Sequence, residues 1–250
     1  MRLAMISDTH GNAVAFEEVI RDLREQSPDA VVFLGDLVMR GPQPAECAEL
    51  LSGLNPLVSI RGNHDDYFAR YAEVSDWQPK NDKEAMNVRS FEYNKRLLSS
   101  AEQRWIGGWP AEHTFFADDM QTELYHAAPG ALAKIVWPWA PPEELAALHR
   151  HEATRLVCFG HIHHAFTRNA GGRTIVNCGS IGLPFDGDNR ASYSIVDIQG
   201  ANMSVQIRRV SYDIEKVIRV AKQRAMPDVE LFELAVRRAE FAYSFSKSAG

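Results

Sequence analysis

The chain has 250 residues, enough for one large domain or for one domain with insertions. Its hydrophobic fraction of 45% and charged fraction of 24% are typical of an ordinary globular protein, and its formal net charge of −6 argues against a general affinity for nucleic acid. The acidic balance does not exclude a phosphate substrate, because bound cations supply positive charge locally. No apolar run in the sequence reaches the ~18 residues that a membrane-spanning helix needs.

The first 60 residues indicate an alternation of strands and helices. Residues 3–6, 30–34 and 56–60 are short apolar runs that predict buried strands, whereas residues 13–26 and 45–54 have the periodicity of helices. Strands and helices that alternate in this way predict parallel strands joined by right-handed crossovers.

Residues 66–112 differ in character, because they mix aromatic and charged residues and lack apolar runs typical of strands. Residues 83–98 predict an amphipathic helix, and Ser100 is suited to cap a second, shorter helix. We interpret the segment as a helical insertion near the carboxyl ends of the strands. A solvated surface excursion with a small core of its own is the alternative, and the sequence leaves it open.

The strand pattern returns in the second half of the chain. Strands are predicted over residues 113–117, 122–127, 155–159, 173–177, 192–198 and 201–209, with a short helix over residues 142–149. Gly171-Gly172 predicts a hairpin turn. Residues 212–248 predict C-terminal helices that are interrupted near Pro227 and that pack on the domain or pair between protomers, so a homo-oligomer stays open. We expect residues 1–250 to form a single domain.

The three cysteines indicate a reducing compartment. Cys47, Cys158 and Cys178 form no CxxC pair. Cys158 lies within an apolar run and Cys178 follows another, so we expect buried, reduced thiols. The first apolar run begins at Leu3, which leaves no room for a secretory signal. These features predict a cytoplasmic protein.

Polar fragments follow several of the predicted strands. The fragments are Asp8-Thr9-His10, Gly35-Asp36, Gly62-Asn63-His64, His126 and Gly160-His161-Ile162-His163. Ligands of open α/β sheets gather at the carboxyl ends of strands, so we expect these fragments to meet. Side chains two positions apart on an extended strand share a face, which predicts that Asp8 and His10 project together, and that His161 and His163 do the same.

The residue types in these fragments favour a metal site. Carboxylates, imidazoles and one amide oxygen, without a thiolate, suit Mn, Fe, Zn, Co or Ni rather than a structural zinc site of the cysteine type. Two ions ~3.5–4 Å apart can share a hydroxide that attacks phosphorus, while an imidazolium donates a proton to the leaving oxygen. His64 suits the second role, because backbone alternation would turn it away from Asn63.

Each fragment has a plainer explanation when it is taken alone. Asp8 would cap a helix, and His126 would be a core histidine with satisfied hydrogen bonds. Neither explanation accounts for the other fragments, so the set as a whole predicts a dinuclear hydrolase. We expect His113, His149 and His151 to be surface or structural residues, and the role of His164, next to His163, stays open.

The same fragments, with Asp65 directly after His64, resemble the signature of calcineurin-like metallophosphoesterases, and within that superfamily the small bacterial and archaeal phosphodiesterase branch. Asn177-Cys178-Gly179-Ser180-Ile181-Gly182 is similar to the Asn-Pro-Gly-Ser-Val-Gly segment of that branch, with Cys178 in place of the proline. The resemblance covers residues 3–64 and roughly 122–210. It implies an α/β (α+β) fold, a four-layer αββα sandwich of two mixed β-sheets flanked by helices.

The resemblance also implies a role for each fragment. One metal ion would be bound by Asp8, His10, Asp36 and His163, and a second by Asp36, Asn63, His126 and His161. Asp36 would bridge the ions, and His64 would be the acid or the stabiliser of the transition state. The implied cofactor is a pair of divalent cations, Mn first, with Fe, Zn, Co or Ni as alternatives.

Arg40 is a candidate for substrate binding. The stretch Gly35-Asp36-Leu37-Val38-Met39-Arg40-Gly41 resembles Gly-Asp-x-Val-Asp-Arg-Gly of Ser/Thr protein phosphatases and diadenosine tetraphosphate hydrolases, where the arginine contacts phosphate. A guanidinium can hold two phosphate oxygens at once. Met39 departs from that pattern, since it replaces the aspartate.

Together these features predict a phosphoesterase, above all a phosphodiesterase, in which a hydroxide that bridges two metal ions attacks phosphorus. Hydrolysis of a dinucleoside polyphosphate or of a phosphoprotein is the alternative enzymatic function, and a non-catalytic binding scaffold is the alternative of another class. The expected partner is a small phosphoester or nucleotide substrate. We expect neither stable nucleic-acid binding nor association with a membrane.

Overall fold

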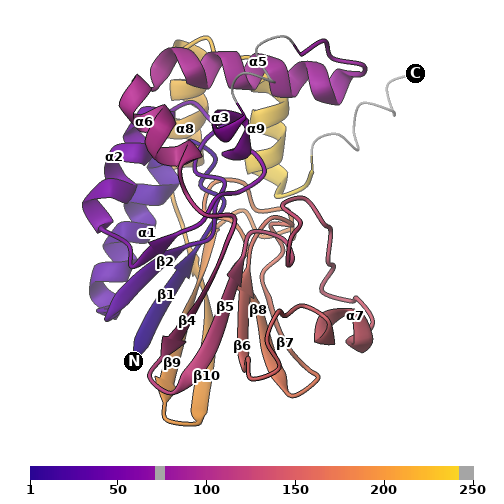
Figure 1. The fold of residues 1–250 in the computed structure, drawn as a ribbon. Helices are drawn as coiled ribbons and strands as arrows, with labels where there is room; N and C mark the ends of the chain where they lie inside the picture. The colour runs from indigo at the N-terminus through magenta and orange to yellow at the C-terminus, as the bar shows by residue number, and fades with distance from the viewer. Residues whose placement is uncertain (71–76, 242–250) are drawn as a thin grey trace.

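Two β-sheets lie face to face between layers of helices (Figure 1). The structure is a computed structural model that describes residues 1–70 and 77–241. The first sheet has the strand order β10-β9-β1-β2-β3. Its strands are β1 (Arg2–Ile6), β2 (Ala30–Phe33), β3 (Val58–Ser59), β9 (Ala191–Gln199) and β10 (Asn202–Val210). The sheet is mixed, because β1, β2 and β3 run parallel whereas β9 is antiparallel to both β1 and β10.

The second sheet has the order β4-β5-β6-β8-β7. Its strands are β4 (Glu112–Ala117), β5 (Met120–Tyr125), β6 (Leu156–Phe159), β7 (Phe166–Ala170) and β8 (Arg173–Asn177). It is also mixed, since β5, β6 and β8 are parallel and the two edge strands are antiparallel to their neighbours.

The apolar run of β1 is continuous because both faces of the strand are buried. Leu3 and Met5 point into the core between the sheets, where they join residues such as Leu124 of the second sheet. Ala4 and Ile6 point to the other face, into the core that the first sheet shares with helices. The residues on both faces therefore fix β1 in the middle of the molecule.

Helices cover the outer faces of the two sheets (Figure 1). Helices α1 (Ala13–Gln26) and α2 (Pro44–Leu54) pack on the first sheet, and α7 (Pro142–Ala146) packs on the second. Asn12 caps α1, because its side chain accepts a hydrogen bond from the backbone N–H of Ala15. The predicted fold of two mixed sheets flanked by helices is confirmed.

The remaining helices gather at one end of the sandwich, where β1 and β2 end (Figure 1). Helices α3 (Asp66–Ala69), α5 (Asp82–Leu97) and α6 (Ser100–Gly107) come from the segment between β3 and β4. Helices α8 (Ile214–Gln223) and α9 (Val229–Arg238) come from the C-terminal part of the chain. Ser99, not Ser100, caps α6, and it forms a capping box with Glu102.

Several predicted elements differ from the structure. The third strand is only Val58–Ser59, and the helix predicted over residues 142–149 ends at Ala146. Strand β7 was missed, because its exposed polar residues leave too few apolar ones to form a pattern. Helix α3 was also missed, since a single turn has no periodicity to detect. Residues 71–76 of the predicted insertion and 242–248 of the predicted C-terminal helices lie outside the described residues.

The three cysteines are buried and unpaired, as the sequence predicts. Across residues 1–70 and 77–241, no helix combines the length and the apolar character that crossing a bilayer requires.

Candidate metal centre

The loops that follow the central strands hold one another through backbone hydrogen bonds. The N–H of Asp8 donates to the carbonyl of Gly35 at 2.9 Å, and the N–H of His10 donates to the carbonyl of Asp36 at 3.1 Å. In the second sheet, the N–H of Gly160 donates to the carbonyl of His126 at 2.9 Å. Pairing therefore continues beyond the strands, and it brings fragments that are far apart in the sequence to one place.

The backbone in these loops is left-handed rather than extended, so Asp8 and His10 project together as predicted, but strand alternation is not the reason. Strand β1 ends at Ile6, and Asp8 and His10 have φ of 55° and 47°. After β6, His161 and His163 have φ of 68° and 58°. A non-glycine residue in this region costs about 1 kcal/mol or more, so four such residues at one place mark a strained and organised site.

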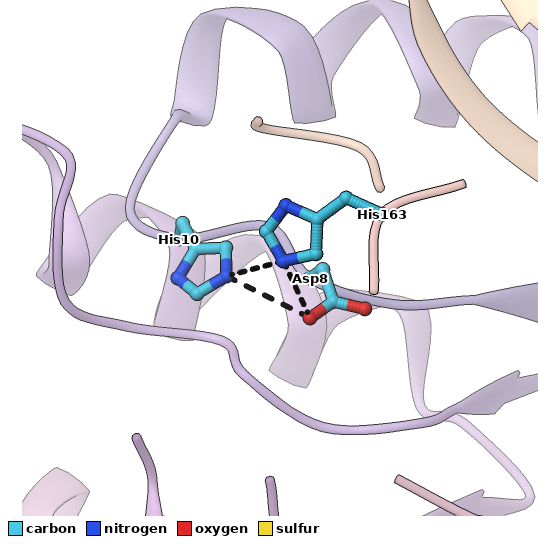
Figure 2. A group of neighbouring side chains, drawn as sticks. All are labelled: Asp8, His10 and His163. Carbon is cyan, nitrogen blue, oxygen red and sulfur yellow. Dashed lines mark hydrogen bonds and ion pairs between the residues drawn. The ribbon is translucent and has the colours of Figure 1, made fainter. Parts of the chain in front are cut away.

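Three buried side chains converge at the end of β1 (Figure 2). The Nε2 atoms of His10 and His163 lie 3.1 Å apart, and Oδ1 of Asp8 lies 3.2 Å from Nε2 of His163 and 3.6 Å from Nε2 of His10. Within the described residues, Oδ1 of Asp8 and Nδ1 of His10 have no hydrogen-bond partner. The unpartnered Oδ1 of Asp8 and the two Nε2 atoms that face each other fit a bound cation.

Hydrogen bonds to backbone carbonyls fix which ring nitrogen of His163 and of His126 faces the centre. Nδ1 of His163 contacts the carbonyl of Leu183, and Nδ1 of His126 lies 2.8 Å from the carbonyl of Leu34. A carbonyl can only accept, so Nδ1 carries the proton in both rings. In the neutral ring Nε2 then presents its lone pair to the centre, as a metal ligand must.

Asp36 lies between two sets of histidines. Its Oδ2 is 3.7 Å from Nε2 of His10 on one side and 3.4 Å from Nε2 of His126 on the other. Nε2 of His126 is also 3.1 Å from Oδ1 of Asn63, and the rings of His126 and His161 are 5.2 Å apart. The structure thus gathers the other five predicted ligands around Asp36 and Asp8.

The charges in the centre shift the pKa values of its members. Burial alone would raise the pKa of Asp36, but the neighbouring His126 and His64 outweigh burial and lower it. Burial would lower the pKa of His126, yet the charge of Asp36 raises it to about 10. The pKa of His161 falls to about 4 through burial and the nearby His126. A cation that binds His126 must therefore displace its proton.

Asp65 is a buried residue of the site to which the sequence analysis gave no role. Its carboxylate accepts hydrogen bonds from the N–H groups of Asp36 at 2.7 Å, Gly62 at 3.0 Å and Leu37 at 3.1 Å. Burial and the charge of Asp36 raise the pKa of Asp65 to about 7. Asp65 ties the loop of Asp36 to the loop of Asn63, and its place directly after His64 was the available signal.

His64 lies in the turn after β3 rather than on an extended strand. Its backbone N–H donates to Oδ1 of Asp36 at 2.8 Å, and Nε of Arg40 donates to its Nε2 at 3.1 Å. Nε2 is therefore the acceptor, and Nδ1 carries the proton in the neutral ring. Within the described residues Nδ1 has no partner. Burial lowers the pKa of His64, and the charge of Arg40 lowers it further.

Helix α5 holds the loop that carries Arg40. The N–H of Met39 donates to Oδ1 of Asn94 at 3.0 Å, and the N–H of Arg40 donates to Oγ of Ser90 at 2.8 Å. Nη2 of Arg40 donates to Oδ1 of Asn87 at 3.1 Å. Both Met39 and Arg40 have φ of 69°, a conformation that these side-chain contacts stabilise. No sequence spacing indicated these contacts, because they join segments about 50 residues apart.

The other histidines have structural partners. Nδ1 of His151 lies 2.8 Å from Oε1 of Glu123, and Nδ1 of His149 lies 2.9 Å from the carbonyl of Ala146. The ring of His113 stacks on Phe115. His164, whose role the sequence left open, has Nδ1 2.7 Å from the carbonyl of Ile162 and belongs to none of the donor groups found among the described residues.

Known proteins resemble this chain over most of its length. An uncharacterized protein of Methanocaldococcus jannaschii is 26% identical over 250 residues, which cover 90% of this chain and 94% of that protein. A probable cyclic nucleotide phosphodiesterase of Synechococcus is 26% identical over 185 residues, which cover 67% of this chain and 71% of that protein.

Solved structures share the fold. The metallophosphoesterase of Sphaerobacter thermophilus is 25% identical, has a TM-score of 0.71, and is matched over 96% of this chain and all of its own. A hypothetical protein of Pyrococcus horikoshii has a TM-score of 0.79 at 17% identity, over 92% of this chain and 97% of its own. The calcineurin-like phosphoesterase superfamily domain matches residues 1–201, which span both sheets except β10 and contain every candidate ligand. The chain therefore belongs to the calcineurin-like phosphoesterase superfamily.

Proposed function

We propose that the protein is a phosphodiesterase that uses two divalent metal ions. The superfamily consists of metal-dependent phosphoesterases, so the finer points are the number of ions, the ester class and the roles of residues. The observation that carries the proposal is the position of Asp36, whose Oδ2 lies between Nε2 of His10 and Nε2 of His126. A carboxylate that faces two sets of imidazoles is suited to join two ions.

The donor atoms divide into two sets that share this carboxylate. The first ion would be held by Asp8, His10, Asp36 and His163, and the second by Asp36, Asn63, His126 and His161. The set of imidazoles and oxygens suits Mn, Fe, Zn, Co or Ni, and we take Mn first, as the resemblance implies. Two such ions supply a nucleophilic hydroxide at neutral pH and neutralise charge on the phosphate.

His64 and Arg40 would act on the substrate directly. Arg40 occupies Nε2 of His64, so we assign Nδ1–H of the neutral His64 to the leaving oxygen as a hydrogen-bond donor. Transfer of a proton from His64 would require the imidazolium, and Nε2 would then no longer accept from Arg40. The guanidinium of Arg40, oriented by Asn87, would bind phosphate oxygens. Both side chains thus stand on the same side of Asp36, and we place the leaving group there.

A small diester is the substrate class that we favour. One relative bears the name of a probable cyclic nucleotide phosphodiesterase, which supports a diester. The arginine beside His64 also suits a dinucleoside polyphosphate or a phosphoprotein, which keeps those substrates as the second candidate.

The buried, unpaired cysteines support a cytoplasmic location.

Cleavage of bis(p-nitrophenyl) phosphate with and without Mn²⁺ tests the proposal. We expect Mn²⁺ to be required, and His64→Ala to lower kcat by roughly 10²- to 10³-fold, the usual contribution of one hydrogen-bond donor to the transition state. His113→Ala, a matched change on β4, should leave kcat unchanged. Equal turnover in the two variants would contradict the role of His64. A faster rate on a dinucleoside polyphosphate or a phosphopeptide would select the second candidate, and no turnover on any phosphoester would favour a binding scaffold.

A further inference from the structure

A cavity opens beside the metal centre, between helix α5, helix α9 and the loop after β8. It encloses about 530 Å³ of empty space, part of it open to solvent. Met86 of α5, Phe232 of α9, Met226 and Phe185 contribute apolar side chains to its lining. The part open to the centre of a water-sized sphere is about 50 Å³, room for roughly three to five water molecules or one small group.

The cavity touches the proposed catalytic centre on two sides. Phe185 lines the cavity, and its ring stacks on the ring of His163, with centroids 4.3 Å apart and planes 14° apart. Arg40 also lines the cavity, and its Nε donates to His64 at 3.1 Å. A phosphate held by the metal centre and Arg40 would therefore carry its ester group into the mouth of the cavity.

The polar groups of the lining already have partners. Oγ of Ser90 accepts the N–H of Arg40, and the carboxylate of Asp228 forms an ion pair with Arg89. Arg40 is the one basic residue among the described residues that line the cavity. A polar group or a second phosphate would give up its hydrogen bonds to water on entering the cavity, and the lining would not replace them. The lining therefore suits an uncharged apolar group attached to one phosphate.

We propose that this cavity binds the leaving alcohol of the substrate, and that this alcohol carries an uncharged apolar group about the size of one aromatic ring. The inference rests on the proposed phosphodiesterase function and adds a substrate class to it. Met226 and α9 lie outside residues 1–201, the part of the chain that matches the superfamily domain. The cavity is thus formed partly by this chain's own C-terminal helices.

Isothermal titration calorimetry on the Mn²⁺-loaded protein tests the cavity without turnover. Phenylphosphonate and methylphosphonate share the charged group and differ in the apolar one. We expect phenylphosphonate to bind roughly 10- to 100-fold more tightly, the factor that burial of one aromatic ring gives. Ala235→Phe and Leu231→Trp fill the cavity from α9, so in both variants this ratio should fall toward one. Ala101→Phe, a matched change at an exposed position of α6, should leave the ratio as it is.

The outcomes separate the cavity from the catalytic proposal. Equal binding of the two phosphonates by the wild type, with turnover of aryl diesters intact, would overturn the cavity proposal alone. A ratio that stays high in both filled variants would also overturn it. If the wild-type ratio is near one and rises only when residues 242–250 are removed, the cavity holds the chain's own terminus and the proposal fails. Absence of both phosphonate binding and turnover would overturn the catalytic proposal together with it.

Discussion

Two buried carboxylates in this molecule, Glu123 and Asp8, differ in how many of their hydrogen bonds are formed. In the second sheet, Glu123 is fully buried and accepts hydrogen bonds from Oγ1 of Thr154 at 2.7 Å, the N–H of Arg150 at 2.8 Å and the N–H of His151 at 2.9 Å. The hydroxyl of Tyr125 also donates to it. At the metal centre, Oδ1 of the equally buried Asp8 has no hydrogen-bond partner among the described residues.

The comparison shows that buried charge alone does not mark a functional site. Around Glu123 every donor points at the carboxylate, so the cluster fastens the end of β5 to the loop before β6. Around Asp8 and Asp36, imidazole nitrogens face one another, and strained backbone holds them there. The first arrangement stabilises the fold, whereas the second sacrifices stability for a binding function.

The largest effect is expected at the centre itself. Asp36→Asn keeps the oxygen that accepts the N–H of His64 but removes the charge that would join two ions. We expect kcat on an aryl phosphodiester to fall roughly 10³-fold or more, because metal ions supply the nucleophile. Asp22→Asn is the control, because it makes the same change in an ion pair between Asp22 of α1 and Arg208 of β10. This variant should leave kcat as it is. Comparable activity in the two variants would remove Asp36 from the mechanism.

Glu123→Gln should have the opposite profile. It places an amide NH₂ among donors, so we expect the free energy of unfolding to drop by about 2–4 kcal/mol, the effect of breaking a buried charged network. Turnover below the melting range should stay as in the wild type. Urea denaturation and steady-state kinetics on the same preparation measure both quantities. A stable but inactive variant would contradict the structural role.

Mn²⁺ should raise the stability of variants that keep the metal centre intact more than that of variants that lack Asp36. A ligand at about 100 times its Kd raises the free energy of unfolding by about 2.7 kcal/mol per site. We therefore expect thermal denaturation of the stripped wild type and of Glu123→Gln to shift upward with Mn²⁺, and that of Asp36→Asn to shift much less. Equal shifts in all three would mean that the ions bind elsewhere.

Acid should weaken the Glu123 cluster, whereas a change of pH near neutrality should not. Burial would raise the pKa of Glu123, but the hydrogen bonds from Tyr125 and Thr154 outweigh burial and lower the pKa from 4.5 to about 2. Since the folded-state pKa is below the unfolded one, the stabilisation is complete above pH 4.5 and is lost as the pH falls toward 2. The stability difference between wild type and Glu123→Gln should shrink over this interval, and a constant difference would refute the assignment.

The smallest effect is expected at the contact between α5 and Arg40. Asn87→Ala removes the acceptor of Nη2 of Arg40, and we expect KM to rise about 3- to 10-fold with kcat less affected, as for one lost hydrogen bond to a charged group. Asn81→Ala, at the N-cap of the same helix, controls for a general loosening of α5. Equal KM values in the two variants would show that Asn87 does not position Arg40.

The apolar runs were enough to predict most of the strands and to select the ligand candidates at their ends, whereas the layered fold was predicted from the resemblance that these fragments carry. The sequence was not enough to predict the geometry of the ligands. Asp8 and His163 meet through left-handed turns, which depend on hydrogen bonds between loops rather than on local preference. Asn94 acts through the backbone N–H of a distant loop, and such a contact leaves no periodic or spacing signal.

The central claim is that this centre hydrolyses phosphodiesters with two metal ions, and a titration of stripped protein with Mn²⁺ tests it most directly. Turnover of bis(p-nitrophenyl) phosphate is followed against the equivalents of Mn²⁺ added per chain. We predict no turnover in the stripped protein and a rise that levels off at two equivalents. Turnover that is unchanged by stripping, or that is complete at one equivalent, would contradict the claim.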